Sequence, residues 1–254
     1  MNIAAAINTL AAFCGPRDVS TLSKEAILTA FGIAQADCMV LFGGSILAGG
    51  DVLAEAMKAG VAKKYVIVGG AGHTTQTLRD NMHAAFPGIE TEERTEAEIF
   101  NEYLRKRYGL IADYLETKST NCGNNITNML KLLDENGVHA ENIILAQDAT
   151  MQRRMAAGLR LHRPDIRIIN YATYWARVND DLSFTEDVWG MWKLDRFVEL
   201  LLGEIPRLRD DGYGPDGKGY IAHEDISAEV EEAFELLSRV YKIRDANPAY
   251  ASKA

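Results

Sequence analysis

Short, almost unbroken apolar runs recur along the chain, and each is followed by a loop of small or hydrogen-bonding residues and then by a helix-period segment. These runs span residues 38–42, 65–68, 111–115, 143–146 and 166–171. Continuous apolar character is typical of strands buried on both faces, which occur in parallel sheets built from βαβ units. The pattern therefore predicts an α/β fold in which helices cover both faces of a doubly wound parallel sheet of about five strands.

Apolar residues repeat at three- and four-residue steps between these runs, which predicts helices. The helices expected in this part of the chain span residues 51–59, 76–85, 95–108, 122–136 and 151–161. Beyond about residue 173 the strand pattern stops, and helices are expected at 186–202 and 228–241, separated by a Gly/Pro-rich stretch at 203–219. We therefore predict an α/β core over residues 36–174, with residues 1–35 and 175–254 forming a helical accessory region packed on it.

The charge balance restricts the partners of such a chain. Its 254 residues include 27 Lys and Arg against 36 Asp and Glu, a formal net charge of −9. Nucleic acids and anionic membranes select surplus positive charge, so neither is expected as a partner. The three cysteines are widely spaced, without a C-x-x-C pair, which indicates a reducing compartment and no structural zinc.

The apolar segment at residues 3–13 lacks the basic flank of a signal peptide and is too short to span a bilayer. A helix packed on the domain is expected there. No H-x-x-x-H pair and no calcium-type acidic loop occurs, so no metal is indicated. We expect a cytoplasmic protein without membrane insertion, whose partner is a small molecule.

Ligands of open parallel sheets bind beyond the carboxyl ends of the strands. Two loops at such ends begin with paired glycines, Gly43-Gly44 before Ser45, and Gly69-Gly70. Glycine lets the backbone approach either a ligand or another part of the chain, so tight strand-to-helix packing is the alternative interpretation. Neither loop is a complete G-x-G-x-x-G, and no G-x-x-x-x-G-K-[ST] phosphate loop occurs.

A third loop carries more polar side chains than helix capping needs. Ser119, Thr120 and Asn121 precede an expected helix, and Asn124 and Asn125 follow on its first turn. One side chain is enough for a cap. The excess indicates hydrogen bonding to a ligand.

The fourth loop places two arginines where a helix disfavours them. It contains Gln147, Asp148, Thr150, Gln152, Arg153 and Arg154. With Thr150 as the expected N-cap, the arginines occupy the first turn, at the positive end of the helix dipole. They require a compensating anion, which is either a ligand group or an internal carboxylate such as Asp148 or Glu116.

Three residues are candidates for acid/base chemistry. Glu116 directly follows an apolar run, and His73 lies in the glycine-rich second loop. Glu96 lies near the start of a helix, where a carboxylate is also favoured simply by the helix dipole. No G-x-S-x-G nucleophile elbow is present.

These loop residues resemble those of the bacterial SanA/ElyC/YdcF family, a domain family of unknown function, over roughly residues 36–230. The matching positions are Gly43, Gly69-Gly70, Glu96, residues 119–123 with Asn125, Gln147-Asp148, residues 150–154, Gly203-Glu204 and residues 206–215. The last stretch is long and unusual, and it places the chain closest to the YdcF-like branch.

The resemblance implies a Rossmann-like core with helical additions. It also implies S-adenosylmethionine as a candidate cofactor, because YdcF-like proteins are described as binding it, without an assigned reaction. Broader relatives are membrane-anchored and linked to the metabolism of envelope precursors. Asn124 stands where the family usually has Glu, and no His lies near Met151 as it often does in the broader family. Both departures favour binding over acid/base catalysis.

Two functions are therefore open. The first is binding of a small anionic or adenosyl-type ligand, such as S-adenosylmethionine, with Arg153 or Arg154 neutralising an anion. The second is a hydrolase or transferase for a phosphorylated nucleotide or envelope precursor, with Glu96, Glu116 or His73 handling protons. A pure interaction role is a third interpretation, because a fold does not fix function.

Overall fold

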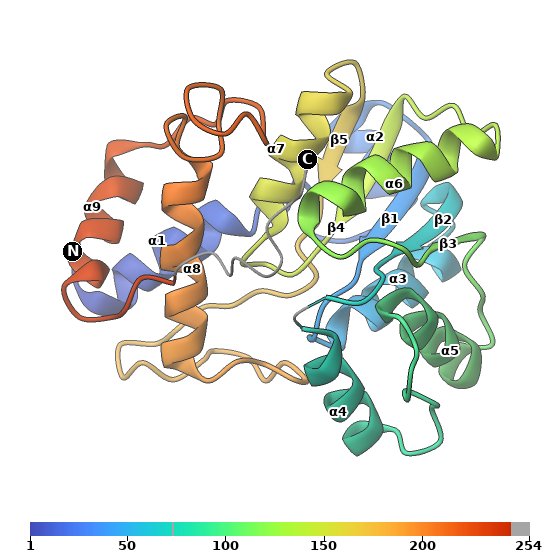
Figure 1. The fold of residues 1–254 in the computed structure, drawn as a ribbon, viewed down its shortest axis with the longest axis horizontal. Coiled ribbons are helices and arrows are strands. Elements are labelled where there is room, and N and C mark those ends of the chain that lie inside the picture. The colour runs from blue at the N-terminus through green and yellow to red at the C-terminus, as the bar shows by residue number, and fades with distance from the viewer. Residues whose placement is uncertain (73, 245–254) are drawn as a thin grey trace.

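The computed structural model describes residues 1–72 and 74–244 and contains a five-stranded, entirely parallel sheet in the order β3-β2-β1-β4-β5 (Figure 1). Its strands are β1 (Ala36–Phe42), β2 (Ala62–Val68), β3 (Tyr114–Glu116), β4 (Asn142–Ala146) and β5 (Arg167–Asn170). The chain runs outward from β1 to one edge and then returns to build the other. The predicted doubly wound, Rossmann-like α/β fold is confirmed.

Helices cover both faces of the sheet because alternate strand residues point to opposite sides. The core helices are α3 (Ala48–Ala59), α4 (Thr75–Ala85), α5 (Glu96–Tyr108), α6 (Cys122–Glu135) and α7 (Gln152–His162). Met39 and Leu41 of β1 pack with side chains of α3, α4 and α5. Val40 and Phe42 pack with α6 and α7 on the other face. The result is the expected three layers.

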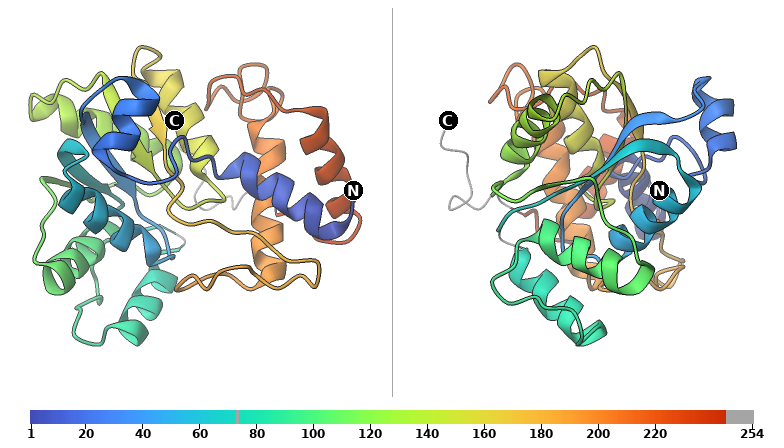
Figure 2. Two further views of the ribbon diagram at one scale, coloured as in Figure 1. Left: turned by 180° about the vertical axis from the view of Figure 1, so that it is seen from behind. Right: turned by 90° about the vertical axis from the view of Figure 1, so that its right-hand side faces the viewer.

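Three further helices build a second apolar cluster beside the sheet. They are α1 (Ile3–Cys14), α8 (Leu194–Leu208) and α9 (Ala228–Ser238), which lie together in both views of Figure 2. Their cluster contains Ile7, Phe197 and Leu201, all completely buried. A fourth helix outside the α/β core, α2 (Lys24–Phe31), packs differently. Its buried Ile27 belongs to the apolar cluster that contains Met39 and Leu41 of β1.

Several element boundaries differ from the sequence-based expectation: β2 begins at Ala62 instead of residue 65, and α3 begins at Ala48 instead of residue 51. Two further differences are larger in effect. The third strand begins at Tyr114 instead of residue 111, and Ile111 is exposed. The helix expected at 186–202 runs from Leu194 to Leu208, so the Gly/Pro-rich stretch begins inside it. Residues 186–193 are irregular because Gly190 adopts a left-handed φ of 75° and the carbonyl of Trp189 accepts a hydrogen bond from Leu47 N. Within the described ranges, no helix is long and apolar enough to cross a membrane.

Candidate functional site

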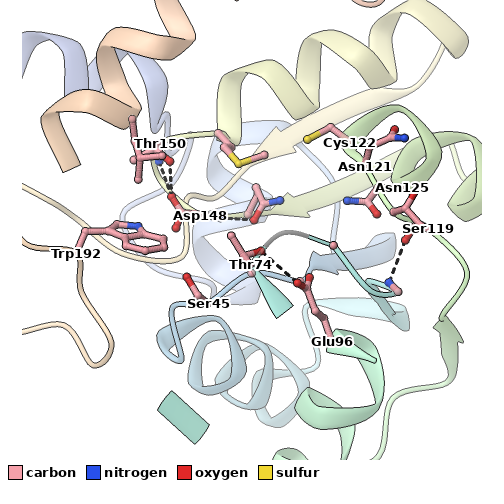
Figure 3. Close-up of a pocket in the computed structure, with 18 of the residues that line it drawn as sticks. Ser45, Thr74, Glu96, Ser119, Asn121, Cys122, Asn125, Asp148, Thr150 and Trp192 are labelled. Atoms are coloured by element: carbon pink, nitrogen blue, oxygen red, sulfur yellow. Dashed lines mark hydrogen bonds between the residues drawn. The ribbon is translucent and has the colours of Figure 1, made fainter. Parts of the chain in front are cut away.

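A pocket lies at the carboxyl edge of the sheet, where the loops after β1, β2, β3 and β4 meet the accessory helix α8 (Figure 3). Its cavity volume is about 90 Å³, and it opens to solvent. Its lining residues are Gly43, Gly44, Ser45, Gly70, Gly72, Thr74, Glu96, Ser119, Thr120, Asn121, Cys122, Asn125, Gln147, Asp148, Thr150, Met151, Trp192, Arg196, Leu200 and Arg244. The four loops singled out from the sequence therefore converge on one cavity.

Glu96 is a buried carboxylate of the pocket, with 8% of the residue exposed. It is the first residue of α5, whose N-cap is Thr95, with Glu98 completing a capping box. The hydroxyls of Thr75 and Thr74 donate to its Oε1 at 2.8 and 3.2 Å. Burial nevertheless raises the pKa of Glu96 above its ordinary value, because these hydrogen bonds only partly offset desolvation. Glu98 has the capping role, and Glu96 faces the pocket.

The paired glycines make room for this carboxylate. A Cβ on Gly43 would lie 2.5 Å from Glu96 Oε2, and a Cβ on Gly69 would lie 2.9 Å from Glu96 Cβ. These two glycines therefore serve the close packing that was the alternative interpretation, and Gly69 does not line the pocket. Gly44 does line it, with only Gln147 Oε1 near its open side, at 3.8 Å.

Asp148 lines the cavity and is held by three hydrogen bonds to one of its oxygens. Its Oδ1 accepts hydrogen bonds from Thr150 N at 2.8 Å, Thr150 Oγ1 at 2.7 Å and Tyr174 OH at 2.8 Å. Burial raises the pKa of this carboxyl in spite of those donors. The expectation that Thr150 caps the next helix is wrong: α7 begins one residue later, with Met151 at the N-cap position, because Thr150 is engaged by Asp148.

The compensating anions for Arg153 and Arg154 come from the accessory region. Arg154 forms a buried ion pair with Glu204 of α8, and Arg153 Nη1 lies 3.0 Å from Glu224 Oε2. The suggested internal partners, Asp148 and Glu116, are wrong. Neither arginine lines the pocket. The geometry therefore gives no support to the prediction that Arg153 or Arg154 neutralises an anionic ligand there.

Three other residues that the sequence suggested for ligand binding or catalysis form hydrogen bonds within the pocket loops. Gln152 is completely buried, accepting from Gln147 N at 2.9 Å and donating to Leu145 O at 2.9 Å. Glu116 Oε1 accepts from the backbone of Lys118 and Ser119, and the residue lies outside the pocket lining. Asn124 Oδ1 accepts from the side chains of Thr120 and Asn121. These contacts fix the loops after β3 and β4.

The loop after β3 contributes one pocket wall. Asn121 caps α6 by accepting from Asn124 N at 3.0 Å, and Ser119 Oγ accepts from Gly70 N at 3.1 Å. Thr120 and Asn125 also line the cavity. Gln147, 2% exposed, lines it from the loop after β4. His73, the remaining candidate, lies outside the described residues.

Sequence reasoning missed the wall that the accessory region supplies. Trp192, Arg196 and Leu200 come from α8 and the segment before it, and Figure 3 shows Trp192 beside Asp148. The predicted helix at 186–202 placed these residues on an accessory element, with no signal that it reaches the strand ends. Cys122, Met151 and Arg244 were also missed, although Cys122 stands within the polar run after β3.

One buried polar atom of the pocket residues has no hydrogen-bond partner. It is Ser45 Oγ, on a residue with 2% exposure. Buried polar atoms nearly always have a partner in a folded protein. This atom is therefore available to a bound molecule.

Comparison with protein-family models finds no match. Among the described residues, no group of His, Cys, Asp and Glu could hold a metal ion.

The raised pKa of Glu96 predicts how the stability of the folded protein changes with pH. The folded state keeps this proton to a higher pH than the unfolded state does, so ionisation destabilises the fold as pH rises above the unfolded pKa. Glu96→Gln removes the titration and keeps an oxygen that accepts from Thr74 and Thr75. We expect its Tm to exceed that of the wild type at pH 7, with the difference shrinking toward about pH 4.

Glu98→Gln is the matched control in a thermal unfolding series across this pH range. Hydrogen bonding to the backbone N–H of Thr95 lowers the pKa of Glu98, so its ionised form stabilises the fold above the unfolded pKa. We expect this variant to lose stability at pH 7 and to approach the wild type as pH falls. The same pH trend in both variants would contradict the assignment.

Proposed function

We propose that the chain binds a small molecule in this pocket, and that the molecule is an adenosyl compound of the S-adenosylmethionine type. The observation that carries the proposal is the buried, unpartnered Ser45 Oγ at the carboxyl edge of the sheet, because this atom has a hydrogen bond to give to a ligand. The resemblance of the loops to the YdcF-like branch supports the adenosyl class.

The pocket chemistry matches the parts of such a ligand. The indole of Trp192 offers a face on which an adenine ring can stack or a sulfonium cation can rest. The carboxylate of Asp148 lines the cavity and is an acceptor for a hydroxyl or ammonium group of such a ligand. Thr120, Asn121 and Asn125 offer neutral donors and acceptors on the opposite wall. Arg196, which pairs with Glu199 at 3.2 Å, is a positively charged residue of the lining.

Titration calorimetry with S-adenosylmethionine tests this function. We expect binding by the wild type, and a loss of about tenfold or more in Asp148→Asn, because a hydrogen bond to a charged group contributes about 1.5–3 kcal/mol. Asp165→Asn, on an exposed aspartate that pairs with Arg163 at 2.8 Å, is the matched control and should bind as the wild type does. No heat of binding with S-adenosylmethionine, S-adenosylhomocysteine or adenosine would reject the adenosyl class.

A second function, transfer or hydrolysis of a phosphorylated substrate, is favoured by one observation. Glu96 is a buried pocket carboxyl with a raised pKa, and this is the property of a general acid. Arg153 and Arg154 are absent from the lining, so a phosphate would depend on Arg196 and Arg244 instead, which places this function second. A panel of phosphomonoesters and nucleotide sugars tests it, and any turnover must disappear in Glu96→Gln.

A further inference from the structure

Cys122 stands at the pocket wall and has no role in the function proposed above. It is one of three free cysteines, and it differs from the other two in access. Cys14 and Cys38 are both 0% exposed, whereas Cys122 is partly exposed. Burial also raises the pKa of Cys38 to about 12, and that of Cys14 further, which keeps both as unreactive thiols.

Cys122 lies beside two positive features of the structure. It is the first residue of α6, after the capping Asn121, so it lies at the positive end of the helix dipole. The buried guanidinium of Arg154 interacts electrostatically with it. A thiolate, and not a thiol, is the attacking species in disulfide exchange. Among the three cysteines, only Cys122 is partly exposed and lines the pocket.

The cavity that Cys122 lines contains a second feature that points to a ligand. Ser45 Oγ, on a residue only 2% exposed, is unpartnered and belongs to the same cavity. Figure 3 places Ser45 and Cys122 on different walls, with the cavity between them. A reagent that reaches Cys122 through this cavity occupies space that a ligand would need.

We propose that Cys122 is a site of reversible covalent modification, at which a low-molecular-weight disulfide forms a mixed disulfide inside the pocket. Cys122 first gives its proton to water, and its thiolate then attacks one sulfur of the small disulfide. The Cys122 S–S bond forms as the S–S bond of the reagent breaks, and the bonding pair leaves with the second sulfur as a thiolate. The protein thiol is oxidised and half of the reagent is reduced, so the exchange needs no other oxidant.

The test follows the reaction of the folded full chain with 4,4′-dithiodipyridine, which releases a coloured thiopyridone for each thiol modified. We expect one fast-reacting thiol per chain, none in Cys122→Ser, and all three after denaturation. Gly44→Leu places a side chain in the cavity and should slow the fast reaction about tenfold, since the reagent must enter there. Gly88→Leu, at an exposed glycine with open space around it, is the matched control and should react as the wild type does.

Two results would overturn the proposal. One is a fast-reacting thiol that persists in Cys122→Ser. The other is a folded Gly44→Leu chain that reacts at the wild-type rate, which would mean that Cys122 is reached from outside the pocket. If Gly44→Leu does not fold, Leu200→Trp on another wall takes its place under the same criterion. None of these readouts depends on which ligand the pocket binds.

Discussion

Glu204→Ala is expected to lower the free energy of unfolding by about 3–5 kcal/mol, because it leaves the Arg154 guanidinium buried without its carboxylate. The side chains of Glu204 and Arg154 are 3% and 12% exposed, and both oxygens of Glu204 accept hydrogen bonds from Arg154. Burial alone would lower the pKa of Arg154, yet the interactions with Cys122 and Glu204 raise it well above its ordinary value. Urea denaturation followed by circular dichroism measures the loss.

Glu231→Ala is the matched control. Glu231 pairs with Arg209, just beyond the end of α8, but both side chains are 34% exposed. Pairs of this kind contribute about 0–1 kcal/mol. Equal losses in the two variants would contradict the view that burial sets the cost. In the same way, the double variant Arg154→Met/Glu204→Leu should recover much of the loss, because it removes both buried charges together.

The ion pair also shows what the sequence could and could not predict. The helix dipole argument correctly required an anion for Arg153 and Arg154, because it depends only on local chain geometry. The identity of that anion depends on tertiary packing. Glu204 and Glu224 lie 50 and 71 positions away along the chain, on the accessory region, so no local pattern connects them to these arginines.

A similar distinction separates the strands from the accessory wall. The parallel sheet was predictable because strands buried on both faces are unbroken apolar runs in the sequence, and the position of a loop after a strand fixes which edge of the sheet it occupies. The face of α8 that lines the pocket was not predictable, because the residues that point to the pocket depend on where the helix begins. The irregular segment before Leu194, with the left-handed Gly190, moves that start eight positions from the expected residue 186. Trp192 reaches the pocket from this segment.

Gly70→Ala is expected to disrupt the pocket and to lower the free energy of unfolding by about 1–3 kcal/mol or more, the usual cost of forcing atoms into filled space. A Cβ at this position would collide with the carbonyl oxygen of Ser119 and would lie 2.9 Å from both Ser119 N and Thr117 O. These are backbone atoms, so the clash cannot be relieved by rotating a side chain. The loop after β3 has to move.

Gly70 also joins the two halves of the site. Its N–H donates to Ser119 Oγ at 3.1 Å, and its carbonyl accepts from Glu96 N at 3.0 Å. Displacing it shifts the start of α5, and with it Glu96, as well as the loop that carries Asn121. We therefore expect Gly70→Ala to lose S-adenosylmethionine binding in calorimetry, while Gly88→Ala, with no atom within 4 Å of its added Cβ, keeps the stability and binding of the wild type. If Gly70→Ala melts and binds as the wild type does, the backbone contact between these loops does not hold the pocket together. The loss of binding together with the loss of stability would instead make Gly70 the point through which strand β2 positions both walls.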